Sequence, residues 1–105
     1  MENIFKNIPA HLDSELIEKI AGNVEGVRVE RIISHGHASP PGYWYDQDNN
    51  EFVIVLKGKA GLLIRDRDEI IRLSRGDYID IPAHTLHRVE WTSPEEDTVW
   101  LAVHY

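Results

Sequence analysis

Residues 76–87 read GDYIDIPAHTLH and combine several local signals in one short stretch. Gly76 permits a tight turn, and the alternating residues 77–81 predict a short β-strand. Pro82 cannot continue a strand ladder, so it ends this one. His87 follows five residues after Pro82. The stretch therefore predicts a turn, a strand and a histidine held just beyond the strand end.

The chain on both sides of this stretch shows the same β character. Short runs rich in Val, Ile, Tyr and Trp alternate with turn residues at the spacing of antiparallel barrels and sandwiches. They predict strands at 27–37, 51–57, 61–65, 69–74, 77–81, 86–92 and 98–104, with hairpin turns at 57–59 and 65–68. Residues 52–56 are apolar on both faces, so this strand is expected to be central or covered by a partner subunit.

The N-terminal region follows a different pattern. Between Leu12 and Ala21 the apolar residues fall three and four apart, with Asp13 or Ser14 available as a cap and Gly22 as a stop. This spacing predicts one short amphipathic helix. We therefore expect an N-terminal helical segment at 1–26 that packs on a β-barrel domain at 27–105.

Histidine is frequent in this chain, with six in 105 residues, and four of the six form two close pairs. His35 and His37 are two residues apart, so on a strand both imidazoles would point to the same face. A lone pair of this kind fits a polar strand end as well as a metal site.

Together, these features resemble the cupin superfamily of small antiparallel β-barrels, also called the double-stranded β-helix or jelly roll. Its first motif is His-x-His, a Glu and, after six residues, a Gly. Its second is a Gly, five residues, Pro-x-Gly, two residues and a His. Glu51 and Gly58 have the first spacing, while Gly76, Pro82 and His87 have the second.

The resemblance implies one divalent metal bound by His35, His37, Glu51 and His87. The sequence departs from the cupin motifs at residues 38–50, which would be an insertion between the two parts of the first motif, and at His84, which replaces a glycine of the second motif. Three imidazoles and one carboxylate suit Fe, Mn, Co, Ni, Cu or Zn. The alternative is an intact barrel whose histidines are hydrogen-bonded core residues without a metal.

Other polar and aromatic residues could line a pocket. His84 could support the metal or substrate, or lie on the surface. Tyr43 and Tyr45 could form a lid over the barrel mouth or pack on its wall, and Gln47 could reach the metal or substrate. His11 and His104 are interpreted as structural or exposed, and the tryptophans at 91 and 100 as core.

Composition narrows the function further. The chain has no cysteine, which removes disulfides, thiolate metal sites and cysteine nucleophiles. Eleven Lys and Arg against 18 Asp and Glu give a net charge of −7, which disfavours nucleic acid and anionic membranes as partners. No apolar run is long enough to span a membrane, so we expect a cytoplasmic protein. We also expect a homodimer and a small-molecule ligand.

Three functions remain at this stage. The first is a small metal-dependent enzyme of the dioxygenase or oxidase type that acts on a small organic molecule. The second is a metal-dependent isomerase or decarboxylase, in which a neighbouring acid or base moves a proton. The third is a non-catalytic module that binds or senses a small ligand.

Overall fold

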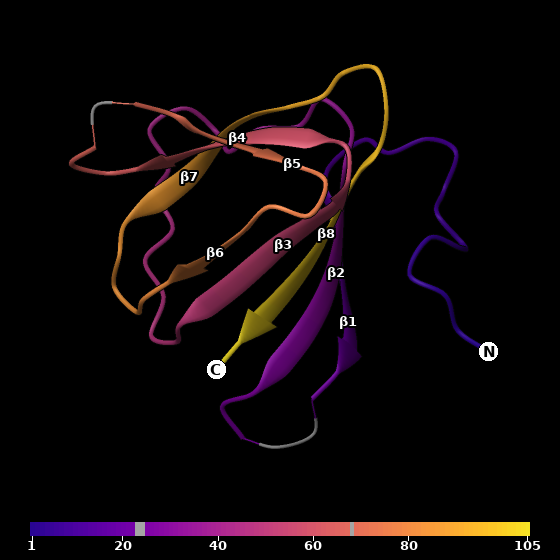
Figure 1. Ribbon diagram of the computed structural model, residues 1–105, viewed down its shortest axis with the longest axis horizontal. Coiled ribbons are helices and arrows are strands. Elements are labelled where there is room, and N and C mark those ends of the chain that lie inside the picture. Colours follow the sequence, from indigo (N-terminus) through magenta and orange to yellow (C-terminus); the bar gives the residue numbers. More distant parts are fainter. Residues whose placement is uncertain (23–24, 68) are drawn as a thin grey trace.

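The computed structural model describes residues 1–22, 25–67 and 69–105, and within them eight β-strands form two antiparallel sheets (Figure 1). The strands are β1 (Leu16–Ala21), β2 (Arg28–Ser34), β3 (Glu51–Lys57), β4 (Lys59–Ile64), β5 (Ile71–Ser74), β6 (Tyr78–Ile81), β7 (His87–Thr92) and β8 (Thr98–His104). The all-β antiparallel barrel predicted from the sequence is confirmed. The predicted 65–68 turn includes Asp68, which lies outside the described residues.

The two sheets have the strand orders β1-β2-β8-β3-β6 and β5-β4-β7. Strands from distant parts of the chain lie side by side, so that the last strand, β8, pairs with both β2 and β3. Figure 1 shows the smaller sheet folded over the larger one. Side chains that point inward from both sheets therefore share one interior.

Strand β3 shows how the alternation of side chains builds the core. Val53 and Val55 point inward and are buried, with exposed fractions of 5% and 0%. They pack in a cluster with residues from the other sheet, including Leu62 and Leu73. Because β3 lies between β8 and β6, its expected central position is confirmed. Its outward residues remain partly exposed, and the homodimer that could cover them stays a prediction.

The N-terminal helix predicted over Leu12–Ala21 is wrong. None of the described residues is helical, and residues 16–21 form β1 at the edge of the larger sheet. Residues Leu16 to Lys19 pair one by one with Ile33 to Glu30 of β2. The backbone hydrogen bonds offered by this open sheet edge override the helical spacing of the side chains.

Other N-terminal contacts come from Arg31 of β2, which is 6% exposed. Its guanidinium donates to Glu18 and to the carbonyl oxygens of Ile4, Lys6 and Asn7. These bonds hold the first residues of the chain against the outer face of the larger sheet.

No helix in the described part of the chain is long and apolar enough to cross a membrane.

The segment that joins β2 to β3 runs along the free edge of β7. The Thr92 hydroxyl donates to the His37 carbonyl, the Ser39 amide to the Val89 carbonyl, and the Tyr45 amide to the His87 carbonyl. The segment therefore travels the length of the smaller sheet, from one end of the barrel to the other. Residues 38–50, expected as an insertion, form this crossing.

Candidate functional site

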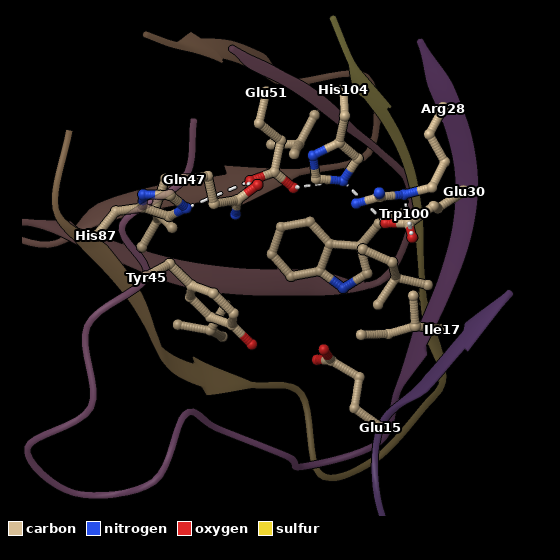
Figure 2. A pocket seen from close by; sticks show the side chains of 14 residues that line it. Glu15, Ile17, Arg28, Glu30, Tyr45, Gln47, Glu51, His87, Trp100 and His104 are labelled. Carbon is tan, nitrogen blue, oxygen red and sulfur yellow. Dashed lines mark hydrogen bonds and ion pairs between the residues drawn. The ribbon is translucent and has the colours of Figure 1, made fainter. Parts of the chain in front are cut away.

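A cavity of about 340 Å³ opens between the two sheets (Figure 2). Six strands and the 38–50 crossing contribute to its wall. Its lining residues are Glu15, Ile17, Arg28, Glu30, Ile32, Tyr45, Gln47, Glu51, Val53, Leu62, His87, Val89, Trp100 and His104. The wall is mainly apolar, with Glu30, Glu51, His87 and His104 gathered along one side and Glu15 apart from them, and a mainly apolar wall with a few polar groups is typical of a small-molecule site.

Strand register explains why acidic and imidazole groups meet there. Glu51 is the first residue of β3, and its partner on β8 is His104. His104 is also paired with Arg28 of β2, two residues before Glu30. Since residues two apart share a face, all four side chains point into the barrel.

These side chains form a continuous polar chain in Figure 2. His87 Nε2 lies 3.3 Å from Glu51 Oε1, and Gln47 Nε2 donates to the same oxygen at 3.2 Å. His104 Nε2 lies 3.7 Å from Glu51 Oε2 and 2.9 Å from Glu30 Oε1. Glu51 is thus the centre of the chain, with one of its oxygens toward His87 and the other toward His104.

His87 is the best-anchored group in the cavity. Its Nδ1 lies 2.8 Å from the Thr85 carbonyl oxygen, which can only accept, so Nδ1 carries a proton and Nε2 faces Glu51. Burial by itself lowers the pKa of His87, but the hydrogen bonds to Glu51 and to the Thr85 carbonyl outweigh burial, and the net pKa is raised. The contact with Glu51 thus favours the protonated form of His87.

His104 is held differently. Its Nε2 faces two carboxylates, but its buried Nδ1 has no hydrogen-bond partner among the described residues. A proton on Nδ1 would be an unsatisfied buried donor, which costs about 1–3 kcal/mol. The geometry therefore favours a proton on Nε2, which donates to Glu30.

Glu15 supplies a separate carboxylate to the same cavity. It accepts a hydrogen bond from the Ser34 hydroxyl at 2.8 Å, and Ser34 in turn accepts from Trp100 Nε1 at 3.2 Å. Burial raises the pKa of Glu15, although the Ser34 bond and the nearby His37 act in the opposite direction. Burial, followed by the charge of Glu15, also raises the pKa of Tyr45.

Four residues singled out from the sequence line this cavity, namely Glu51, His87, Tyr45 and Gln47. Tyr45 stacks on His87 with ring centroids 5.5 Å apart and an interplanar angle of 24°. Gln47 and Tyr45 precede Glu51 by four and six residues, and they, unlike His35 and His37, lie beside Glu51 and His87.

The other two predicted metal ligands, His35 and His37, are not brought to Glu51. His35 directly follows Ser34, which pairs with Thr98, whereas Glu51 pairs with His104 at the other end of β8. That separation along the strand is about 20 Å. His35 Nδ1 instead lies 3.0 Å from Asp97, and His37 Nδ1 accepts from the His35 backbone amide.

His84 and Tyr43 lie on the surface and do not line the cavity. His84 Nδ1 is 2.9 Å from Asp46, and the His84 side chain is 63% exposed. Tyr43 is 49% exposed and meets Tyr45 edge to face, with centroids 5.0 Å apart. Tyr43 thus packs behind a cavity residue, and a lid role for it stays a prediction.

The predicted metal can be tested against this arrangement. Among residues 1–22, 25–67 and 69–105, no group of three or more His, Asp or Glu side chains could hold a metal ion as placed. Glu51 and His87 do offer a carboxylate and an imidazole, and the Thr85 carbonyl orients the imidazole in the way metal ligands are oriented. The described side chains therefore fit a metal ion only in part.

Sequence reasoning missed Glu15, Glu30, Arg28 and His104 as cavity residues. A signal for two of them was present, since Arg28 and Glu30 alternate with outward-facing residues in a predicted strand. The sequence predicts His104 only as structural or exposed, because nothing in the local sequence shows that it pairs with Glu51. Glu15 was hidden by the wrong prediction of a helix.

The antiparallel barrel with its site inside defines the class of the protein. A family model for the Cupin domain matches residues 29–104, and the chain belongs to this family. A search of the curated proteins finds no match.

Among solved structures, the chain is similar to a protein from Ralstonia eutropha JMP134 that is provisionally named a mannose-6-phosphate isomerase. The two are 41% identical over 99% of this chain and 95% of the other, with a TM-score of 0.95. More distant likenesses show the fold alone. An RmlC-like cupin from Methanocaldococcus jannaschii is 17% identical over 92% of this chain and 84% of the other, with a TM-score of 0.70. The polyketide cyclase RemF from Streptomyces resistomycificus is 19% identical over 88% of this chain and 65% of the other, with a TM-score of 0.73.

Proposed function

We propose that the cavity binds a small organic carbonyl compound and that Glu51 and His87 exchange protons with it. One observation carries this proposal: both side chains are buried, they contact each other at 3.3 Å, and they line the cavity. A carboxylate beside an imidazole of raised pKa is a suitable acid and base pair near neutral pH. The function proposed is thus an isomerase-type proton transfer.

The roles of the two groups follow from their protonation. Glu51 Oε1 accepts a proton from the carbon next to the carbonyl, and the electron pair of that C–H bond forms a carbon–carbon double bond. His87 Nε2 gives its proton to the carbonyl oxygen, which yields an enol. When the carbon next to the carbonyl carries a hydroxyl group, this enol is an enediol. Glu51 then returns the proton to the former carbonyl carbon while His87 Nε2 takes the proton of the neighbouring hydroxyl, which becomes the new carbonyl, so the isomerisation needs no oxidant or reductant. General acid–base catalysis of this kind contributes about 10²–10⁴-fold in rate.

Neighbouring residues position this pair. Gln47 donates to the Glu51 oxygen that faces His87, and His104 approaches the other oxygen. Both contacts limit rotation of the carboxylate. The Thr85 carbonyl fixes the His87 ring, so its Nε2 points at the cavity side of Glu51. The isomerase name of the Ralstonia eutropha relative agrees with this reaction class and supports it by name alone.

The metal-dependent oxidation expected from the sequence remains a separate proposal. A divalent metal at Glu51 and His87 would supply Lewis-acid polarisation of a bound carbonyl or activation of dioxygen. His35 and His37 would reach it only if the crossing segment rearranged. The proton-transfer proposal is preferred because it uses the side chains as they lie.

Deuterium exchange tests the proposal directly. The protein is incubated in D₂O with a panel of small aldehydes, ketones and aldoses, including mannose 6-phosphate, and mass spectrometry measures deuterium at carbon. We expect incorporation into at least one compound, and at least a hundredfold loss of rate in Glu51→Gln and His87→Gln. His84→Gln is the matched control, because His84 is an exposed histidine outside the cavity.

The competing function is a ligand-binding module without catalysis, which the mainly apolar wall also permits. The same panel separates the two functions. Compounds that bind in the cavity without any exchange above the solvent rate would favour the binding module and refute the proton-transfer role of Glu51.

A further inference from the structure

The wall that carries Glu15 belongs to a part of the chain outside the matched family region. Glu15 and Ile17 lie at β1, whereas the Cupin domain match begins at residue 29. In Figure 2 Glu15 lies on the far side of Trp100 from Glu51, and the Tyr45 side chain extends toward it. The residue just before the edge strand β1 thus brings a third carboxylate into the cavity, in addition to Glu30 and Glu51.

The other charged groups of the cavity have partners of opposite charge. Arg28 Nε pairs with Glu30 at 2.9 Å, and Glu51 pairs with His87. Glu15 has only the neutral Ser34 hydroxyl. In the described residues no Lys, Arg or His side chain comes within ion-pair distance of Glu15. Burial raises the pKa of Glu15; the Ser34 hydrogen bond and the nearby His37, which forms no ion pair with Glu15, only oppose this shift.

The residues around Glu15 suit a cationic ligand. The rings of Tyr45 and Trp100 line the same cavity, and aromatic faces attract ammonium groups. A phosphate or carboxylate would meet three carboxylates, Glu15, Glu30 and Glu51, while the Arg28 side chain is already paired. An organic ammonium would instead supply the counter-charge that Glu15 lacks.

We infer that Glu15 is a specificity-determining residue and that the cavity takes a small primary amine whose ammonium group lies between Glu15, Tyr45 and Trp100. The inference rests on the proposed binding of a small organic molecule in this cavity. It adds that this carbonyl compound also carries a primary amine on an apolar body. The end that carries the ammonium lies at Glu15, and the remainder extends toward Glu51 and His87.

Three probes of one shape test this inference: cyclohexylmethylamine, cyclohexylmethanol and cyclohexanecarboxylate. Binding is followed at pH 7.5 by calorimetry and by the indole N–H signal of Trp100 in ¹⁵N NMR, since this group is linked to Glu15 through Ser34. We expect the amine to bind about tenfold more tightly than the alcohol, and the carboxylate to bind least.

Glu15→Gln should abolish the preference for the amine while leaving binding of the alcohol unchanged, because glutamine keeps the shape and can still accept from Ser34. Glu96→Gln, at an exposed carboxylate away from the cavity, should retain the preference. Equal binding of amine and alcohol, a preference that survives in Glu15→Gln, or no binding by any probe would each overturn the inference. Deuterium exchange that is lost in Glu51→Gln would leave the proposed function standing in those cases.

Discussion

Replacing Gly58 by alanine tests why a glycine occupies the turn between β3 and β4. Gly58 has a φ of +87°, in the region that L side chains rarely adopt. A methyl group there would lie 2.5 Å from Thr98 Oγ1 and 2.6 Å from Thr98 Cα. The Thr98 hydroxyl also bonds to the backbone of Lys59, so the close approach is part of the packing of β8 against the turn.

Gly76 provides the matched control, since it has almost the same φ and open space around it. Its φ is +89°, and a methyl group would meet no atom within 4 Å. The two substitutions therefore share the backbone strain and the change in unfolded-chain entropy. They differ in the steric conflict with Thr98, which only Gly58→Ala creates.

The magnitudes follow from these terms. A left-handed conformation costs alanine about 1–2 kcal/mol, and the stiffer unfolded chain returns about 0.4–1 kcal/mol. Gly76→Ala should therefore lower the free energy of unfolding by about 1 kcal/mol. Overpacking against a backbone atom adds about 1–3 kcal/mol, so Gly58→Ala should lose about 2–4 kcal/mol.

Urea denaturation of the parent and both variants, followed by tryptophan fluorescence, measures the difference. Equal losses in the two variants would refute the reasoning, because they would show that the contact with Thr98 costs nothing. A larger loss in Gly76→Ala than in Gly58→Ala would refute it as well. A changed m-value would indicate a changed native or denatured state and would call for native-state hydrogen exchange at β8.

Three further perturbations test the site and the N-terminal segment. Glu51→Gln should lower the pKa of His87, measured by NMR titration, because burial then acts with less opposition. The pKa of His87 in the folded protein is raised above 6.5, so His87 contributes its full stabilisation below pH 6.5 and loses it as the pH rises through the raised value. The free energy of unfolding should therefore depend less on pH in this range in Glu51→Gln than in the parent. The protein is reconstituted with Mn, Fe, Ni, Cu or Zn and dialysed, and elemental analysis then measures its metal content. Compared with the parent, we expect less metal in His87→Gln and the same amount in His35→Ala. A loss of metal in His35→Ala would instead support the four-ligand set predicted from the sequence. Arg31→Lys should speed proteolysis of the N-terminal segment, because lysine cannot reproduce the fork of bonds to three carbonyls and a carboxylate, and an unchanged cleavage rate would contradict this role.

Much of the fold was predictable because its signals are local. The turn glycines, the alternation in residues 77–81 and the apolar strand at 51–57 each act over a few residues. The N-terminal region was predicted wrongly because helical spacing is also local, whereas the partner that makes β1 a strand is β2. An edge that is open for hydrogen bonding cannot be seen in residues 12–21 themselves.

The candidate site was predictable only in part. Glu51 and His87 were found because each stands at a fixed spacing from a glycine or proline in its own motif. His35 and His37 were chosen for their chemistry and spacing to each other. The distance of His35 from Glu51 is set by the pairing of β2 and β3 with opposite ends of β8, which no local pattern shows.

Local pattern was thus enough for an antiparallel barrel without thiols, and for two of its interior polar groups. Only the folded chain shows that His104 pairs with Glu51 and that Arg28 forms an ion pair with Glu30. It alone also shows that Glu15, just before β1, lines the same cavity. The physical reason is register: pairing between strands far apart in sequence chooses which alternate side chains meet, and that choice is made by the packed barrel as a whole.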